Sequence, residues 1–542
     1  MSRREAVLSA GLVFAAALVV RLLFSAEIVF PKPEDSAYYV GVARNLVEGR
    51  GLISDALWSY QTPPLIVPRP AFEVWMPLPT FLAAIPMALF GTTFSSSQLS
   101  SILVGAVVPV LAWRLAADVA AERGFETGRA RSLALGAGLT TALYLPLILG
   151  STVPDSTMPF AALVLGACLL MPRIARDPRG ARLTDPRLVV LGVLLGLSAL
   201  TRNETAWLAL IWVGYAWLGT HATHGARIRL IGVVGVVALA VFAPWAYRNL
   251  TEFGSPLPSQ AATNALYLTG YDIFAWNDTP SLSRYLDQGL AWLVSVRIQG
   301  MLHNLINVLV ILGLPISVIG LVALPWQARG SALRPLLLIS LVVFWFLSLV
   351  FPAATQWGTF LHAGGPVHVL VVLSGLLALD AVIVWVGRRR GWTRPIAWLG
   401  PALGVFGAAL FSVALLPTFG AGSSATARLY EELGRRAAAA GHPLDATAGP
   451  VISNYPIWLA ETRRIPTLGL PNEPPNDVLD LARSFPGTHL LVMVQATGPH
   501  WPADLTNGAP GAECFHPVDL GPGPTGEPDP LTDVQVLEIA CP

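Results

Sequence analysis

The stretch Pro31-Lys32-Pro33-Glu34-Asp35-Ser36-Ala37-Tyr38-Tyr39 directly follows the first apolar region of the chain, whose core covers residues 6–20. It places two carboxylates where a membrane helix would meet water. A carboxylate beside a bilayer is costly unless it has a partner or a task. Taken alone, this stretch favours a plain helix cap by Asp35 or Ser36. A functional interpretation depends on what the rest of the chain brings to the same side of the membrane.

The composition indicates a polytopic membrane protein. Of the 542 residues, 54% are hydrophobic and only 12% are charged, whereas soluble domains carry about 25% charged residues. The net charge of +1 gives no sign of a nucleic-acid partner, because the positions of charges matter more than their sum in a membrane chain.

Eleven apolar runs approach the length of about 20 residues that spans a bilayer, and they predict an all-α bundle of eleven transmembrane helices. Phe24 stands where a small residue should precede signal cleavage, so we expect the first helix to stay uncleaved. The runs cover residues 6–20, 97–117, 132–150, 156–172, 188–202, 204–220, 229–247, 302–325, 335–353, 367–386 and 395–416.

Arginines near helix ends mark the cytoplasmic side of a membrane protein, and here they follow every even-numbered helix. We therefore expect a multi-pass protein of the inner or plasma membrane, with a cytoplasmic N-terminus and an extracytoplasmic C-terminal tail. The arginines concerned are Arg114, Arg123, Arg129, Arg131, Arg173, Arg176, Arg179, Arg182, Arg187, Arg227, Arg229, Arg329, Arg334, Arg388, Arg389, Arg390 and Arg394.

Two of the outward loops are long, at residues 25–96 and 248–301. Within the first, residues 36–50 have an apolar face opposite a charged one, which predicts a helix along the membrane surface. Residues 76–90 are apolar but contain three prolines, so we expect a re-entrant or interfacial element and not a span.

The composition changes after the last apolar run, which predicts a transmembrane domain over residues 1–417 and a small extracytoplasmic α/β domain over 418–542. The pattern predicts helices at 425–440 and 477–484 and strands at 451–453 and 489–494. Cys514 and Cys541 lie in this tail and could pair if it faces an oxidising compartment, whereas Cys168 reads as a buried apolar residue.

Further charges fall on the outer side of the membrane. Asp155 occupies the short outward turn between the third and fourth helices, at the depth expected for Asp35. Arg202 and Arg248 end helices five and seven on the same side. Their plain interpretation is a helix cap for Asp155 and snorkelling to the headgroups for the arginines. The functional interpretation is a pair of guanidinium forks that hold a phosphate.

These residue types suit displacement of a phosphate from a lipid-linked sugar. A leaving phosphate needs charge neutralisation, which arginine provides, while the attacking hydroxyl needs a base, for which Asp35 is the candidate. An ordinary aspartate is a weak base, with a pKa of about 3.9. Partial desolvation by Tyr38, Tyr39 and Trp75 would raise that pKa.

Four short segments, in this order, resemble the GT-C glycosyltransferases, in particular the branch of protein mannosyltransferases and aminoarabinose transferases (glycosyltransferase family 39-like). The resemblance covers residues 1 to about 420, and the order and placement of the segments carry it. They are the acidic loop after the first helix, the Pro-Leu-Pro run ending in Phe90-Gly91, the segment Gly196 to Glu204, and Pro244-Trp245-Ala246-Tyr247-Arg248-Asn249 with Phe253-Gly254.

The resemblance implies a polyprenyl-phosphate-linked sugar as donor, a lipid, glycan or protein as acceptor, and an inverting transfer of a hexosyl or pentosyl group at the outer face. By position, Asp35 would be the base, Asp155 a second acidic residue, and Arg202 and Arg248 phosphate contacts. The order Glu34-Asp35 reverses the pair found in many members of the superfamily, so either carboxylate remains a candidate base.

The late outward loop lacks the Arg-Tyr of many relatives, which leaves His362 either as a donor-phosphate contact or as a histidine satisfied by local backbone. We expect the substrate pocket to include Tyr38, Tyr39, Arg69, Trp75, Glu204 and Tyr271.

Metal use varies within the superfamily. The site would need either no cofactor or a divalent cation such as Mg²⁺ or Mn²⁺ held by Asp35 and Asp155. His221 and His224 have a ligand-like spacing but lie in a predicted cytoplasmic loop.

Three other functions stay open: a lipid or glycan transporter or flippase, a lipid-linked glycan polymerase or ligase, and a non-catalytic sensor. A transporter would place charged or broken helices near the bilayer midplane. The charges here cluster at helix ends instead, with Asp380 as the exception.

Overall fold

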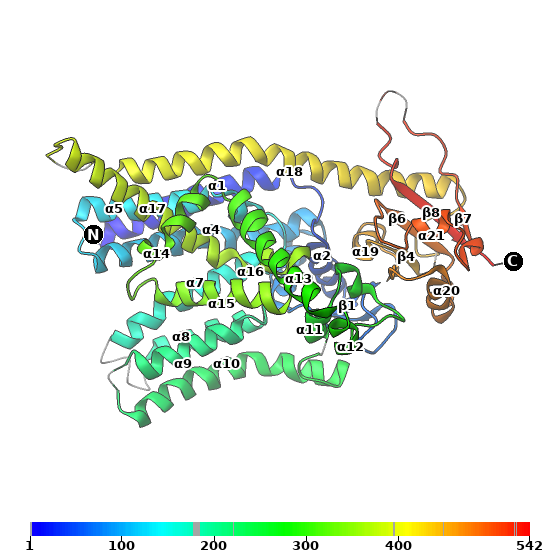
Figure 1. Ribbon diagram of the computed structural model, residues 1–542, viewed down its shortest axis with the longest axis horizontal. Coiled ribbons are helices and arrows are strands. Elements are labelled where there is room, and N and C mark those ends of the chain that lie inside the picture. The colour runs from blue at the N-terminus through cyan, green and yellow to red at the C-terminus, as the bar shows by residue number, and fades with distance from the viewer. Residues whose placement is uncertain are drawn as a thin grey trace.

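The computed structural model describes residues 3–176, 185–220, 222–258, 260–393, 396–447, 449–524, 526 and 528–541. Its long helices run side by side along the longest axis of the molecule, and a mixed sheet lies at one end (Figure 1). The predicted all-α polytopic bundle is therefore confirmed. Four residues of the sequence predictions, Arg179, Arg182, Arg394 and His221, lie outside the described part of the chain.

Seven helical stretches in the described ranges are long and apolar enough to cross a membrane, and five apolar helices are shorter. The number of spans stays a prediction. The seven are α1 (Arg3–Ser25), α4 (Phe94–Glu122), α7 (Thr157–Arg176), α10 (His224–Phe253), residues Gly289–Ile311, α17 (Gly365–Arg389) and α18 (Leu399–Ala439). The five are α3 (Leu78–Phe90), α8 (Pro186–Ala199), α9 (Thr205–Leu218), α14 (Ile316–Gln327) and α15 (Arg334–Val350).

Two predicted helices are divided in the structure. The run 132–150 forms α5 (Thr127–Ala142) and α6 (Leu145–Leu149), since Pro146 lacks the N–H needed to continue a helix. The run 302–325 is shared between α14 and a helix that begins earlier, as α13 (Gly289–Leu302), and continues as a π-helical segment, His303–Ile311.

Glycines let α8 and α10 pack closely, which sets the positions of the loops at their ends. A Cβ on Gly192 or Gly196 would lie 2.6 Å from the Cβ of Val237 or Val241, respectively. Small residues four apart permit such close backbone approach between membrane helices. The loop after α8 carries Arg202.

The amphipathic helix predicted at residues 36–50 is α2 (Glu34–Val47). It does not lie open along a surface, because α3 packs on it from one side and α19 (Pro456–Arg463) of the C-terminal region packs on another. Arg44 of α2 donates a 2.8 Å hydrogen bond to Glu461 of α19. The charged face of this helix, which the sequence predicts to face water, thus forms an ion pair with a neighbouring helix. The proline-containing segment 76–90 forms the short helix α3, which ends at Gly91.

The C-terminal region contains a six-stranded sheet in the order β2-β5-β4-β6-β8-β7. Its first strand, β2 (Ala56–Leu57), comes from the first outward loop and pairs in parallel with β5 (Thr467–Gly469). The other strands are β4 (Val451–Ser453), β6 (Leu490–Val494), β7 (Phe515–Pro517) and β8 (Val534–Ile539). Strands β1 (Ile53–Ser54) and β3 (Arg69–Pro70) form a separate antiparallel pair.

The predicted strands at 451–453 and 489–494 correspond to β4 and β6, and the predicted helix at 477–484 to α20 (Pro475–Ser484). The remaining short helices are α11 (Gln260–Thr263), α12 (Leu282–Leu286), α16 (Thr359–Ala363) and α21 (Ala503–Thr506). The predicted domain boundary at 417/418 falls inside α18, which runs along nearly the whole molecule (Figure 1).

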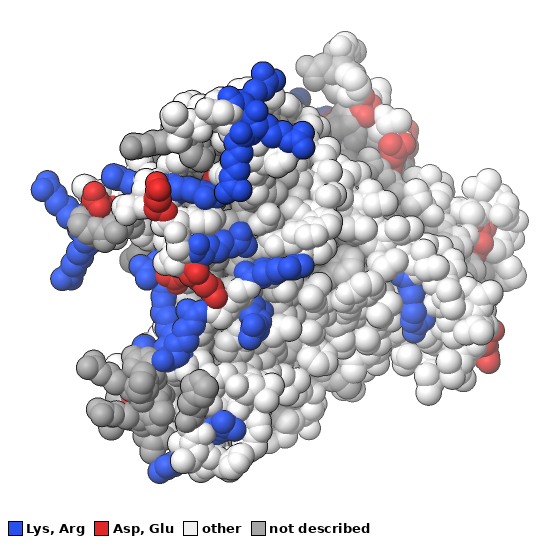
Figure 2. Space-filling view, turned by 60° about the vertical axis from the view of Figure 1, so that its left-hand side comes forward, with Lys and Arg blue, Asp and Glu red and all other residues white. Residues whose placement is uncertain are grey.

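Positive side chains gather on the end of the bundle far from the sheet (Figure 2). Some of them are paired: Arg129 donates to Asp380 at 3.0 Å, and Arg176 lies 3.3 Å from Glu122. Asp380, the exception to the clustering of charges at helix ends, therefore has an arginine as its partner. This basic end is the one that the arginine pattern predicts to be cytoplasmic.

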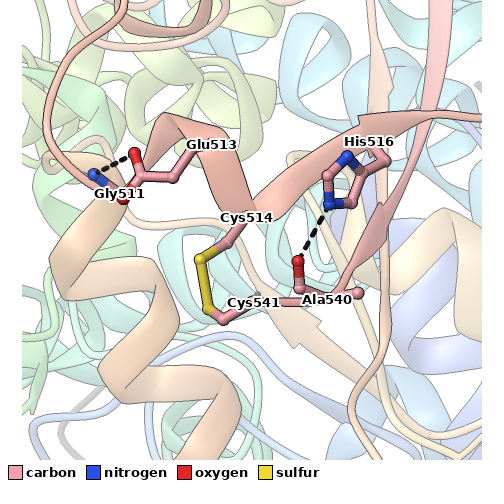
Figure 3. The surroundings of a disulfide bond; sticks show 6 residues. All are labelled: Gly511, Glu513, Cys514, His516, Ala540 and Cys541. Carbon is pink, nitrogen blue, oxygen red and sulfur yellow. Dashed lines mark hydrogen bonds between the residues drawn. A yellow bond between two sulfur atoms is a disulfide. The ribbon is translucent and has the colours of Figure 1, made fainter.

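Cys514 and Cys541 form a disulfide beside β7 and β8 (Figure 3), whereas Cys168 is a free, buried thiol. In denaturant without reductant, we expect one thiol of the three cysteines to react with a maleimide. Reduction should expose all three thiols, as counted by mass spectrometry. In Cys168→Ala no thiol should react before reduction, and three reactive thiols in the unreduced wild type would contradict the disulfide.

Candidate active site

Three side chains from separate segments meet at the sheet end of the bundle. Asp35 stands in the first turn of α2, Asp155 in the turn before α7, and His362 in α16. The imidazole of His362 bridges the two carboxylates: its Nε2 lies 3.3 Å from Oδ2 of Asp35, and its Nδ1 lies 2.7 Å from Oδ2 of Asp155. These two contacts join residues that are more than 200 positions apart in the chain.

The helix-cap interpretation applies to Asp155 but not to Asp35. One carboxylate oxygen of Asp155 accepts hydrogen bonds from the backbone N–H and the hydroxyl of Thr157, both at 2.7 Å, at the start of α7. Its second oxygen faces His362. Helix α2 begins after Pro33 without a side-chain cap, so Asp35 stays available to the interior.

The electrostatics of this cluster follow from burial and mutual attraction. Burial raises the pKa of Asp35 and the nearby Asp155 charge adds to this, while His362 and Arg202 partly offset the shift. Burial alone would lower the pKa of His362, but the two carboxylates raise it to about 9. Burial opposes ionisation of Asp155, yet His362 and Thr157 outweigh it and lower its pKa to about 2. At neutral pH the cluster therefore contains an imidazolium next to an ionised Asp155.

Glu34 points away from this cluster. Its Oε1 accepts a hydrogen bond from the N–H of Ile457 at 3.1 Å, at the start of α19. Burial raises the pKa of Glu34 to about 8, against the lowering effect of the α19 backbone N–H groups. The structure separates the two adjacent carboxylates, with Asp35 facing the bundle interior and Glu34 facing the C-terminal region.

Arg202 lies on the other side of the cluster, in the turn between α8 and α9. Its Nη1 donates to the hydroxyl of Ser156 at 3.0 Å and its Nη2 to the backbone carbonyl of Thr359 at 3.3 Å. It also forms a two-pronged pair with Glu204, through Nε at 3.1 Å and Nη2 at 2.8 Å.

A cavity of about 430 Å³ opens beside these residues. One wall is polar and includes Asp35, Arg202, Glu204 and His362. Another wall, from α9 and α15 and the segment after α15, is apolar. The apolar lining includes Trp207, Phe346, Leu347, Phe351 and Ala354. A ligand with one charged end and one hydrocarbon end would match both walls.

The predicted pocket residues divide into two groups. Tyr39, Trp75 and Glu204 line the cavity. Tyr38 does not, because its ring packs 4.4 Å from that of Trp75 and its hydroxyl accepts a hydrogen bond from the N–H of Phe72 at 2.6 Å. Tyr271 lies next to the cavity, with its ring 5.3 Å from that of the lining residue Trp357.

Two predicted cations lie outside the cavity lining. Arg248 donates to the backbone carbonyl of Ala71 at 2.6 Å and lies 5.0 Å from the ring of Trp245, so it holds the first outward loop to α10. Arg69 is fully buried, with a 3.4 Å ion pair to Glu73. The sequence predicted both arginines on the same side as Asp35, but it could not determine where their side chains point.

Sequence reasoning did not single out several residues that shape the site. Trp207 and Trp357 line the cavity, and Ser156 and Thr359 hold Arg202. The adjacency of Ser156 to Asp155 is a sequence feature that could have indicated its role. A tryptophan within an apolar run, by contrast, cannot be distinguished by sequence from other residues of a membrane helix.

A divalent cation held by Asp35 and Asp155 stays a prediction. Both ring nitrogens of His362 already face Asp35 and Asp155, and the described ranges contain no group of three His, Cys, Asp or Glu side chains suited to hold a metal. The positive charge between the two carboxylates comes from the imidazole.

No family model and no curated protein matches this chain. Its fold is similar to that of ArnT from Cupriavidus metallidurans bound to undecaprenyl phosphate, with 13% identity over 99% of this chain and 98% of that one and a TM-score of 0.57. It is also similar to the oligosaccharyltransferase AglB from Archaeoglobus fulgidus in complex with an inhibitory peptide and a dolichol-phosphate, with 14% identity over 89% and 69% and a TM-score of 0.53.

The bundle of apolar helices and the sheet-bearing end define a multi-pass membrane protein. Its fold is the GT-C fold of these neighbours, as the resemblance of the short segments predicted.

The buried Arg69 and Glu73 pair generates a stability prediction. Both side chains are 0% exposed, and neither carboxylate oxygen of Glu73 has a hydrogen-bond partner among the described residues. We expect Arg69→Met to destabilise the protein by about 3–5 kcal/mol, because it leaves a buried charge unpaired. The double variant Arg69→Met/Glu73→Gln should recover part of that loss in thermal unfolding, because it removes the unpaired charge but does not restore the hydrogen bonds that Arg69 donates to the carbonyls of Ser59 and Thr62. Equal stability of the single and double variants would contradict a structural pair.

Proposed function

We propose that this chain is a glycosyltransferase that moves a sugar from a polyprenyl-phosphate donor to an acceptor hydroxyl at the outer face of the membrane. The observation that carries the proposal is the cavity, which combines the partly buried carboxylate of Asp35, an arginine and an apolar wall in a GT-C fold. The neighbouring structures contain undecaprenyl phosphate in one case and a dolichol-phosphate in the other, which supports a lipid phosphate as ligand.

The donor would lie across the two walls. Its isoprenoid chain fits the apolar wall of α9 and α15, and its phosphate would lie near Arg202, which keeps its charge at any physiological pH. Guanidinium groups bind phosphate through charge-assisted hydrogen bonds. A neutralised phosphate is a better leaving group without being protonated.

The reaction would be a single displacement. The acceptor hydroxyl oxygen attacks the anomeric carbon of a hexosyl or pentosyl group from the face opposite the phosphate. The bond between that carbon and the phosphate oxygen breaks, with inversion. Asp35 takes the hydroxyl proton, and the polyprenyl phosphate leaves with the electron pair. A lipid, a glycan or a protein can supply such a hydroxyl.

His362 and Asp155 would support Asp35 in this role. The imidazolium lies between the carboxylates and offsets their repulsion, while Asp155 fixes the ring through Nδ1. The raised pKa of Asp35 makes it a stronger base than an ordinary aspartate. The chemistry takes place on the outer side if the basic end of the bundle is cytoplasmic, as its arginines predict.

Substitution of Asp35 tests the base. We expect Asp35→Asn to lower kcat by about 10²–10⁴-fold, the usual contribution of general-base catalysis. The assay is transfer from radiolabelled polyprenyl-phosphate sugars by the purified full-length protein. Glu34→Gln is the matched control and should retain kcat within a few-fold, because Glu34 faces α19.

Equal turnover by Asp35→Asn and wild type would remove Asp35 as base. If no donor released lipid phosphate, while lipid or glycan crossed reconstituted membranes, the flippase alternative would be favoured instead.

The pH profile tests His362. Activity should rise as pH increases through the raised pKa of Asp35, because the base must be ionised. It should fall as pH increases through about 9, where His362 loses its proton. In His362→Gln we expect the alkaline limb to disappear and the acidic limb to move to higher pH, because the cation that lowers the pKa of Asp35 is gone.

A charge-assisted contact contributes about 1.5–3 kcal/mol, so kcat of His362→Gln should fall by about tenfold or more. An unchanged alkaline limb in this variant would assign that limb to another group.

A further inference from the structure

The pair between Arg202 and Glu204 occupies the part of the cavity where a phosphate would bind. Glu204 engages two nitrogens of the guanidinium, Nε and Nη2, at 3.1 and 2.8 Å. Their side chains are only 13% and 7% exposed, and both line the cavity. Because a carboxylate and a phosphate fit the same guanidinium fork, the carboxylate holds the geometry that a phosphate would need.

Glu204 has no capping task that would explain its position. Helix α9 begins at Thr205, and Glu204 stands at the position before it without a side-chain hydrogen bond to the helix backbone. Residues at that position usually stabilise a helix through such a bond. The carboxylate is instead turned toward Arg202.

Arg202 has two further anchors besides Glu204. Its Nη1 is held by the hydroxyl of Ser156 and its Nη2 also reaches the carbonyl of Thr359. Both anchors lie on segments that carry the Asp155 and His362 cluster. The fork would therefore stay directed into the cavity if Glu204 were replaced by another anion.

We propose that Glu204 is an internal competitor for the phosphate of the lipid carrier, so that the phosphomonoester and the Glu204 carboxylate exchange on the Arg202 fork. The proposal rests on the proposed function and adds a role in releasing the spent carrier. A transferase of this kind produces a phosphomonoester, which carries more negative charge than the phosphodiester donor. A buried arginine without a counterion would bind that product tightly, because an unpaired buried charge is unfavourable. Glu204 removes this penalty when the product leaves.

Direct binding tests the exchange without any turnover. We would measure the Kd of a polyprenyl phosphate, without a sugar, for the full-length protein in detergent by the quenching of tryptophan fluorescence. Trp75, Trp207 and Trp357 line the cavity and report on its occupancy. We expect Glu204→Gln, which keeps the size of the side chain and removes its charge, to bind about tenfold more tightly than wild type.

Two further variants separate competition from a general change of the cavity. Glu204→Asp keeps the charge, so its Kd should stay nearer that of wild type than of Glu204→Gln. Arg202→Gln should bind weakly, and Arg202→Gln/Glu204→Gln should bind no more tightly than Arg202→Gln alone, because the competitor acts only through the fork. Such a cycle isolates the coupling between two side chains.

Two ligands separate the headgroup from the hydrocarbon chain. The corresponding polyprenol, which lacks the phosphate, should bind all four variants and the wild type alike. Inorganic phosphate should bind more weakly than the lipid but with the same dependence on Glu204. Dependence on Glu204 with inorganic phosphate and not with the lipid would assign the site to free phosphate and overturn the proposed carrier role.

A different result for Glu204→Gln would contradict the competitor role. If Glu204→Gln lowers the unfolding temperature but leaves the Kd of the polyprenyl phosphate unchanged, the pair is structural and the proposal fails. If that variant does not fold, Glu204→Ala and Glu204→Asp provide the same comparison. Since binding is measured without a donor sugar, loss of the transferase assignment and loss of the competitor role give different outcomes.

In a working transferase, the same variant has a kinetic signature. Tighter binding of the spent carrier should make it a stronger product inhibitor of Glu204→Gln than of wild type, by about the same factor as the change in Kd. A structural role alone would not change product inhibition.

Discussion

The contact of one imidazole with two carboxylates is the interaction on which the rest of the site depends. The buried Asp155 and the partly buried Asp35 repel one another and would take up protons or move apart without a cation. His362 supplies that cation, and it comes from a loop remote in sequence from both partners. The first turn of α2, the turn before α7 and the short helix α16 must therefore meet at one place.

The C-terminal region takes part in holding this arrangement. Helix α2 carries Asp35 toward the bundle and Glu34 toward α19, on adjacent residues. The Arg44 and Glu461 pair adds a second contact between α2 and α19, further along α2. Strand β2 also joins the first outward loop to the C-terminal sheet. The region that looked like a separate outer domain in the sequence is thus part of the support of the candidate active site.

The cavity has one polar wall and one apolar wall, and the proposed function is based on this division. The charged wall would handle a phosphate and a hydroxyl, and the apolar wall would handle a hydrocarbon chain. The proposed competitor role of Glu204 follows from the same division. Among the described residues, Glu204 is the carboxylate that forms a two-pronged pair with the guanidinium of Arg202, where a phosphate would bind.

The sequence by itself determined the class of fold, an amphipathic helix at residues 36–50 that corresponds to α2, the main strands of the C-terminal sheet, and the placement of Asp35, Asp155, Arg202 and Arg248 at one end of the bundle. These follow from hydrophobic length and from charges at helix ends, which are local properties. Only the tertiary structure decided that Asp35 and not Glu34 faces the cavity, that His362 joins the carboxylates, and that Arg69 and Arg248 serve the packing of loops. The direction of a side chain depends on partners hundreds of residues away, and no local pattern encodes it.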